Sequence, residues 1–208
     1  MIAGGMTKTR LADGIFLVKF DTQYQLASTF LRVQEHYESS RFRNRVFSLE
    51  EYMDWYAAEF GAFTYYQDWS GFNVPSSAFK AFHDGKFDPL LKKEERLLRL
   101  FRREPPPYYV IGIASEVTLK HELAHALFFA RPGYRNAVLA AMHGYDTSAL
   151  RNRLAKMGYH RGVLVDEVHA YLIAPADELA VSSRALAPLR KELRAIYRKH
   201  AAGLRSRR

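Results

Sequence analysis

Apolar residues recur along this chain with two spacings, which predict many helices and a few strands. Leu26, Phe30, Val33 and Tyr37 repeat every three or four positions, which predicts a helix ending near residue 39. The same criteria predict helices over residues 48–60, 75–82, 88–103, 115–131, 134–143, 147–157, 163–174 and 188–202. Runs rich in β-branched and aromatic residues predict strands over residues 14–20 and 108–113, after an irregular start over residues 1–13. The expected fold is α+β and mainly helical, with a small sheet.

Capping residues indicate where several of these helices begin and end. Thr22 and Ser48 are each followed three positions later by Gln or Glu, which predicts two capping boxes. Gly61 is expected to end the second helix. Asp88 followed by Pro89 predicts another helix start at residue 88.

Residues 62–75 are first aromatic and then rich in turn formers, which predicts a short strand leading into a loop. Tyr66, Trp69 and Phe72 in this segment either line a substrate cleft or form a corner of the core. The second interpretation is favoured, because buried Tyr and Trp commonly pack with their polar tips hydrogen-bonded.

The strongest chemical signal is the run His121-Glu122-Leu123-Ala124-His125 within a predicted helix that follows a strand. Two histidines four residues apart on a helix lie about 40° apart around its axis and about 6 Å along it. Their imidazoles can therefore converge on one zinc ion, which needs three protein ligands if a position is to stay open for water. Glu122 lies beside that point, where a general base for water is needed. Ser115 is the expected N-cap of this helix, with Glu116 in its first turn.

A third ligand is expected from the helix predicted over residues 163–174, which holds the densest later set of donors. Glu167, 42 residues after His125 (167 − 125), is the preferred ligand, in competition with Asp166 and His169. Tyr171 lies one turn beyond Glu167 on the same face, so it can reach the ligand or a developing oxyanion, a role for which His169 also competes.

The His121-to-His125 motif followed by Glu167 on a later helix resembles the gluzincin type of zincin metallopeptidase. The resemblance implies a zincin-like fold, a zinc cofactor held by His121, His125 and Glu167, and peptide-bond hydrolysis with Glu122 as catalytic base. It covers residues 108–175 at most. One position departs from the family pattern, because Tyr171 stands where an acid often orients a motif histidine. The third histidine of metzincins is absent, and the first 100 residues resemble no family.

Two other functions stay open. Glu122 with His125, and Asp166 with His169, are both carboxylate-x-x-His pairs, which are typical of di-iron or di-manganese carboxylate bundles in which Glu35 or Glu51 would supply further acids. Alternatively, the chain is a regulatory or nucleic-acid-associated module without catalysis. His143 and His160 are interpreted as ordinary surface or loop histidines.

The length and composition of the chain bear on its domain organisation and its location in the cell. With 208 residues and 48% hydrophobic content, residues 1–208 are expected to form one domain, with a helical half (1–104), a metal-site half (105–175) and a basic C-terminal helix (176–208). The absence of cysteine excludes disulfides and thiolate zinc ligands, and fits a reducing interior. No apolar run reaches the 18 or so residues of a membrane span, so a cytoplasmic location is expected.

The formal net charge of +9 is concentrated at the C-terminal end. Residues 184–208 hold nine Lys or Arg and one acid, Glu192, which gives +8 (9 − 1). This basic face could contact nucleic acid, anionic lipid or an acidic partner, although such a face is more often simply solvated. The charge therefore says little about the metal site.

Overall fold

The computed structural model describes residues 5–174, 184–202 and 204. Its sheet contains β1 (Met6–Ala12), β2 (Ile15–Phe20), β3 (Gly71–Pro75) and β4 (Tyr109–Ile113), in the order β1-β2-β4-β3. β2 runs parallel to β4. β1 pairs antiparallel with β2, and β3 pairs antiparallel with β4. The sheet therefore takes strands from both sides of the 105–107 proline run, and β3 lies at its edge.

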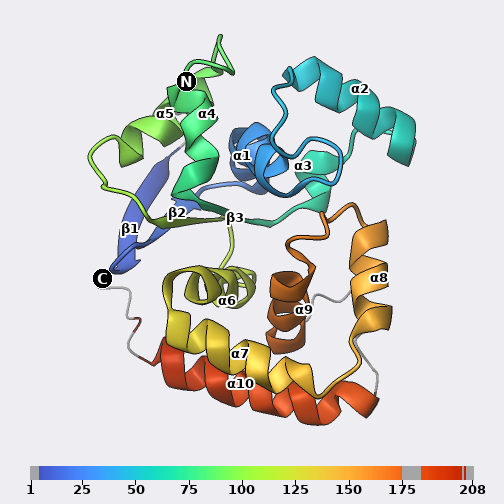
Figure 1. Ribbon diagram of the computed structural model, residues 1–208. Helices are drawn as coiled ribbons and strands as arrows, with labels where there is room; N and C mark the ends of the chain where they lie inside the picture. The colour runs from blue at the N-terminus through green and yellow to red at the C-terminus, as the bar shows by residue number, and fades with distance from the viewer. Residues whose placement is uncertain (1–4, 175–183, 203, 205–208) are drawn as a thin grey trace.

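Helices cover both faces of the sheet (Figure 1). One side carries α1 (Gln23–Glu38), α2 (Leu49–Phe60), α3 (Tyr65–Asp68), the 3₁₀ turn Ser76–Phe79, α4 (Lys80–His83) and α5 (Lys92–Phe101). The other carries α6 (Leu119–Ala130), α7 (Pro132–His143), α8 (Ser148–Lys156), α9 (Leu164–Ile173), the 3₁₀ turn Arg184–Leu186 and α10 (Ala187–Ala201). The chain is thus mainly helical α+β with a small mixed sheet, as its apolar spacing predicted.

Each face of the sheet packs against its own apolar core, because successive side chains of a strand point to opposite sides. On β2, Phe16 and Val18 belong to the core shared with α1, whereas Ile15 and Leu17 belong to the core shared with α6. α6 packs on β3, β4 and α9. This arrangement puts the His-Glu-x-x-His helix directly under the β3 edge.

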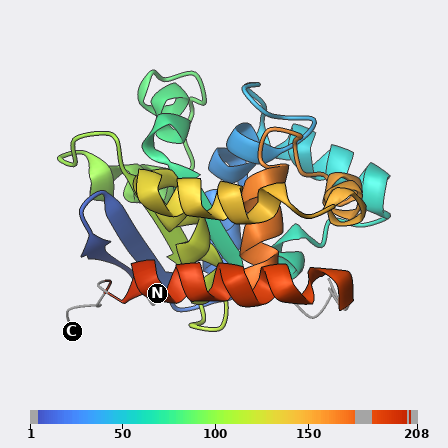
Figure 2. The same cartoon turned by 60° about the horizontal axis from the view of Figure 1, so that its bottom comes forward.

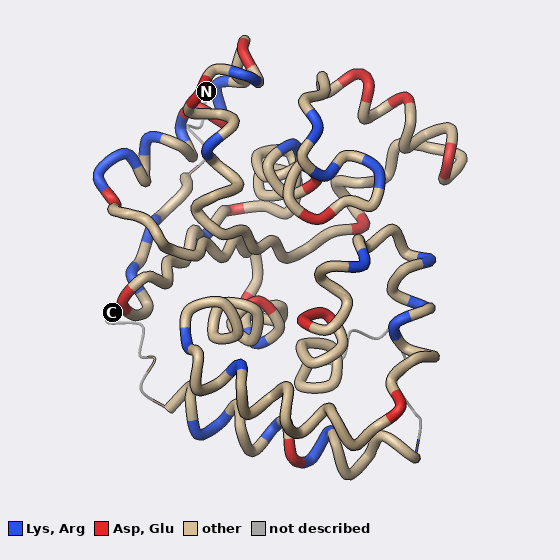
Figure 3. Tube along the Cα trace, in the orientation of Figure 1, with Lys and Arg blue, Asp and Glu red and all other residues tan. Residues whose placement is uncertain are grey.

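α7 and α10 form an outer layer beyond α6 and α9 (Figure 2). The apolar residues Leu189, Leu193 and Tyr197 of α10 are buried, and Lys and Arg positions line the outer helices (Figure 3). The predicted basic helix is therefore present as α10. Residues 176–183, 203 and 205–208 of the predicted C-terminal segment lie outside the described residues, and its proposed partners stay a prediction. None of the described helices is long and apolar enough to cross a membrane.

Two regions of the chain fold differently from expectation. Residues 6–12 form β1 rather than an irregular start, because their backbone pairs with β2 through the turn at Gly14, whose φ is 72°. Both faces of β1 carry polar residues, so the sequence lacks the alternation of apolar and polar residues that predicts a strand. Residues 62–75 form the short helix α3 and then strand β3, not a strand followed by a loop.

Two predicted helix starts are wrong. α5 starts at Lys92 with Leu91 as its N-cap, and Asp88 lies before it. α6 starts at Leu119 with Thr118 as its N-cap, so Ser115 does not cap it. The side chain of Glu116 instead pairs with Lys19, at 2.9 Å.

Other predicted helix ends are confirmed. The hydroxyl groups of Thr22 and Ser48 accept hydrogen bonds from backbone N–H groups three residues on. Gly61 ends α2 with a φ of 87°, in the left-handed region that favours glycine.

Candidate metal centre

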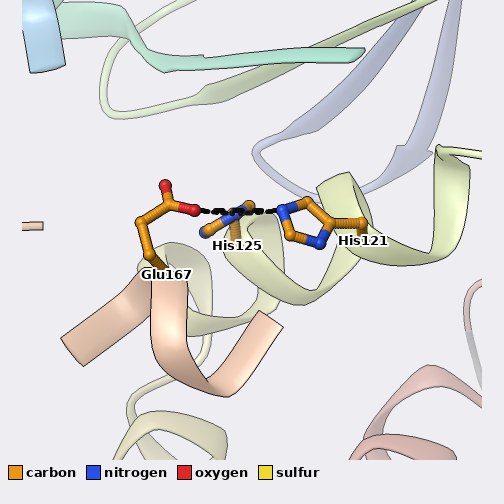
Figure 4. A group of neighbouring side chains, drawn as sticks. All are labelled: His121, His125 and Glu167. Atoms are coloured by element: carbon orange, nitrogen blue, oxygen red, sulfur yellow. Dashed lines mark hydrogen bonds and ion pairs between the residues drawn. The ribbon is translucent and has the colours of Figure 1, made fainter. Parts of the chain in front are cut away.

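The two motif histidines and one acid from a distant helix converge on a single point (Figure 4). His121 and His125 stand one turn apart on α6, with their Nε2 atoms 3.2 Å apart. Oε2 of Glu167, on α9, lies 3.6 Å from Nε2 of His125 and 3.9 Å from Nε2 of His121. With bonds of about 2.0–2.1 Å, two ligands of a tetrahedral zinc ion lie about 3.3 Å apart. The three predicted ligands are therefore brought together at distances close to those of a zinc site.

The polar contacts around these side chains also fit a cation. Nδ1 of His121 lies 3.4 Å from the carbonyl oxygen of Ala174, and Nδ1 of His125 lies 3.0 Å from Oδ1 of Asp166. Both Nδ1 atoms face acceptors, which leaves the two Nε2 atoms free to offer lone pairs to a metal. Oε2 of Glu167 is buried without a hydrogen-bond partner among the described residues. Three lone-pair donors thus face one another, and a divalent cation satisfies all three.

Asp166 and His169, the competing candidates for the third ligand, lie outside this cluster. Consecutive helix residues point about 100° apart, so Asp166 faces the far side of the His125 ring. Oδ1 of Asp166 also lies 3.2 Å from Nδ1 of His169. His169 is fully buried and stacks on Phe128, with ring centroids 4.9 Å apart. An acid therefore orients a motif histidine, but it precedes Glu167 instead of following it by four residues.

Glu122 is held at the edge of the sheet, beside the three converging groups. It is 5% exposed, and its Oε2 accepts a hydrogen bond of 2.7 Å from Nδ2 of Asn73 on β3. The Tyr109 hydroxyl donates to Oδ1 of Asn73, which fixes the orientation of the amide. A Cβ atom at Gly71 would lie 2.2 Å from Oε1 of Glu122, so only glycine leaves room for this carboxylate. Sequence reasoning missed Asn73 and Gly71, because neither belongs to a pattern that marks them as neighbours of Glu122.

Burial strongly perturbs the ionisation of these groups. Desolvation raises the pKa of Glu122, raises the pKa of Glu167 to about 8, and lowers the pKa of His121 to about 3. Burial also disfavours the charged form of His125, but Asp166 and Glu167 outweigh it and raise the pKa of His125 to about 10. A proton on His125 thus supplies positive charge beside its acidic neighbours, a role that a bound cation would also fill.

The three converging groups open into a cavity of about 670 Å³. Tyr171 lines it beside the histidines, with its ring centroid 4.6 Å from that of His121 and its hydroxyl oxygen 3.2 Å from that of Tyr159. Of the three aromatic residues considered for a cleft, Trp69 and Phe72 line the cavity, and Phe72 also belongs to the core. Tyr66 packs against that core and is not among the residues that line the cavity.

The geometry needed for two metal ions is not found in the described part of the chain. Among the described residues, His121, His125 and Glu167 are the only group of three or more potential ligands whose ligand atoms all lie within 4.8 Å of one another. Glu35 accepts a hydrogen bond from Tyr65, and Glu51 pairs with Arg45.

His143 and His160, the two histidines interpreted from the sequence as ordinary surface or loop residues, also lie outside the centre. His143 is exposed on α7. Nδ1 of His160 accepts a hydrogen bond from the backbone N–H of Gly162 within its own loop.

Comparisons of the chain with protein-family models, with curated proteins and with solved structures gave no match. The resemblance to gluzincins therefore rests on the motif and on the convergence of Glu167 with its two histidines.

Proposed function

We propose that this protein is a zinc-dependent peptidase. The observation that carries the proposal is the convergence of two imidazole Nε2 atoms and one buried carboxylate oxygen at separations of 3.2–3.9 Å. No described residue gives that oxygen a hydrogen bond. Imidazole and carboxylate donors suit zinc, and a set of three protein ligands leaves a position open for catalysis. His121, His125 and Glu167 would hold the ion.

Glu122 is the proposed general base. A bound zinc ion would polarise the scissile carbonyl and lower the pKa of water to about 7. Glu122 would take a proton from the attacking water and pass it to the departing nitrogen. Burial raises the pKa of this carboxyl, which brings its proton affinity closer to that of the groups with which it exchanges protons. Asn73 holds the carboxylate still and Gly71 leaves room for it.

Tyr171 is the proposed donor to the oxyanion, because it lines the cavity beside His121 and carries a hydroxyl group. Its hydroxyl pairs with that of Tyr159, which limits its orientation. His169 cannot serve as this oxyanion donor, because it is fully buried behind His125.

The test compares three variants of the full-length chain after loading with zinc. Zinc content is measured by plasma mass spectrometry, and hydrolysis by the new termini formed in a peptide mixture of varied sequence. We expect one zinc ion per wild-type chain. Glu122→Gln should keep the zinc and lose hydrolysis by about 10²–10⁴-fold, the usual contribution of a general base. His121→Ala should lose the zinc itself.

His143→Ala, which removes an exposed histidine of α7, is the matched control and should change neither readout. A Glu122→Gln variant that hydrolyses peptides at the wild-type rate would refute the mechanism. A chain that cannot be loaded with zinc would refute the function, and two iron or manganese ions per chain would support the di-metal alternative.

A further inference from the structure

The cavity continues from the metal centre along a wall of aromatic rings on α2 and α3. Six aromatic side chains line this part, namely those of Tyr52, Trp55, Tyr56, Phe60, Tyr65 and Trp69. Neighbouring rings are in contact, with centroids 4.5 Å apart for Tyr56 and Phe60 and 5.4 Å apart for Tyr52 and Tyr65. We call these six residues the aromatic wall.

The aromatic wall is continuous with the metal centre. The ring centroid of Trp69 lies 6.2 Å from that of Tyr65 and 6.1 Å from that of Tyr159. The Tyr159 hydroxyl meets that of Tyr171, whose ring contacts His121.

The metal centre and the aromatic wall line the same cavity, so a ligand at the metal centre can place a side chain against the accessible rings of the wall. These are Trp55, Phe60 and Trp69, because Tyr52 and Tyr65 are only 1% exposed and Tyr56 6%.

Carboxylates share this part of the cavity, although the chain as a whole is basic, with a formal charge of +9. Glu35 and Glu38 enter from α1, and Asp68 enters from the end of α3. None of the described residues that line the cavity is Lys or Arg. Figure 3 shows acidic positions of α1, α6 and α9 near the middle, and basic positions on α5, α8 and α10 and on the loop that follows α1.

Asp68 and Glu35 accept hydrogen bonds from hydroxyl groups, whereas the positive charge of His125 acts on Glu38. Oδ2 of Asp68 accepts hydrogen bonds of 2.6 Å from the hydroxyl groups of Tyr56 and Thr64, and Oε1 of Glu35 accepts one of 2.8 Å from Tyr65. These partners are all neutral. Burial raises the pKa of Glu35 to about 7, as expected for a carboxyl without a nearby positive charge.

We propose that the aromatic wall with Glu35, Glu38 and Asp68 is a specificity subsite for a cationic side chain, arginine above all. Rings whose faces carry negative potential attract cations, and carboxylates at the same place add charge-assisted hydrogen bonds. A planar guanidinium group can stack on a ring and also bind a carboxylate through two N–H groups, which an ammonium group cannot do. This inference rests on the proposed peptidase function and names its substrate class as peptides with an arginine or lysine near the cleaved bond.

The binding test does not depend on hydrolysis. Both tryptophans of the chain, Trp55 and Trp69, line the cavity, so their fluorescence reports on this subsite. The zinc-loaded full-length chain is titrated with N-acetyl-arginine amide and with N-acetyl-citrulline amide, which has nearly the same shape but no charge. Calorimetry is run in parallel. We expect saturable binding of the arginine compound, at least about tenfold tighter than that of the citrulline compound.

Three isosteric variants locate the binding. Glu35→Gln and Asp68→Asn should each weaken binding of the arginine compound by roughly five- to tenfold, because each removes one facing carboxylate. Asp54→Asn is the matched control, since Asp54 is an exposed acid of α2 that does not line the cavity. It should leave binding unchanged. Circular dichroism checks that each variant is folded.

Equal binding of the two compounds, tighter binding of an uncharged one, or no binding by either method would overturn the proposal. So would weakening by Asp54→Asn equal to that by Asp68→Asn. A second measurement compares kcat/KM for peptides that differ only by arginine or citrulline near the cleaved bond. If arginine-selective binding is found but no peptide is hydrolysed, the subsite stands and the peptidase function fails, so the two proposals are tested separately.

Discussion

Nδ1 of His125 lies 3.0 Å from Oδ1 of Asp166, while the next residue of α9, Glu167, faces the other nitrogen of the same ring. Two consecutive residues thus contact opposite edges of one imidazole. Asp166 sets which nitrogen carries the proton, and this leaves Nε2 free for a metal. The arrangement suggests how a short segment of α9 can supply both a ligand and the support for another ligand.

We predict that Asp166→Asn weakens zinc binding by about 10–100-fold, the usual effect of losing a partner of a metal-bound histidine. The substitution removes the negative charge that holds the Nδ1 proton of His125. Competition with a chromogenic chelator measures the affinity, with Asp54→Asn as the control for loss of one acid. Unchanged zinc affinity in a folded Asp166→Asn protein would show that Asp166 does not support the centre.

Gly71→Ala should impair hydrolysis without removing zinc. The new methyl group would lie 2.2 Å from Oε1 of Glu122 and 2.9 Å from Cδ, so the carboxylate must move away from Asn73. We expect kcat to fall by at least about tenfold, because a base out of hydrogen-bond reach of its proton is ineffective.

Gly144→Ala is the control for Gly71→Ala, since a Cβ atom there would meet nothing within 4 Å and its φ of −85° suits any residue. Wild-type kcat in Gly71→Ala would argue against Glu122 as the base. Loss of zinc from this variant would instead point to damage of the whole centre.

Glu35→Gln should change the pH dependence of stability. The pKa of Glu35 is raised by burial from 4.5 to about 7, so the folded state binds this proton more tightly than the unfolded state. Protonated Glu35 therefore contributes its full share of the unfolding free energy below pH 4.5, and this contribution is lost as the pH rises through about 7. Glutamine can still accept the Tyr65 hydrogen bond and cannot ionise.

Urea unfolding at pH 4 and at pH 8 measures this effect. Relative to the wild type, Glu35→Gln should gain roughly 1–3 kcal/mol of unfolding free energy on going from pH 4 to pH 8, an upper range set by the size of the pKa shift. An equal difference at both pH values would contradict the prediction. A gain would mean that this acid is kept at the expense of stability, as is common for binding sites.

The Arg32–Glu94 pair joins α1 to α5 within the protein, and breaking it should be costly. Both side chains are buried, at 7% and 1% exposure, and Nε of Arg32 donates to Oε1 of Glu94 at 2.7 Å. Glu94→Leu should lower the free energy of unfolding by about 3–5 kcal/mol, because it leaves a buried guanidinium without its counter-ion. Replacing both residues with apolar ones of similar size should restore most of the loss. Denaturant unfolding of the single and double variants tests both statements.

The sequence predicted features that depend on local spacing and missed those that depend on distant segments. The helix of His121 and His125, the strand before it and the caps at Thr22 and Ser48 follow from patterns within a few residues. Glu167 was identified because the helix predicted over residues 163–174 holds the densest set of possible ligands after the motif.

The contacts that surround these residues had no such signal. Strand β1 has polar residues on both faces, and its place depends on pairing with β2. Asn73 contacts Glu122, and Asp166 contacts His125, only because β3 and α9 pack against α6. Whether Asp166 or Glu167 faces the histidines depends on the rotation of α9 about its axis, which packing decides and composition does not.

The sheet separates two cores, and the cavity lies where both layers meet beyond the β3 edge. Residues 23–69 supply the aromatic wall and its acids, whereas residues 119–171 supply the proposed metal ligands and the proposed base. On the proposed function, selectivity and chemistry are therefore encoded in separate stretches of the gene. Substitutions within the first stretch would then change the preferred target and leave the proposed ligands and base in place.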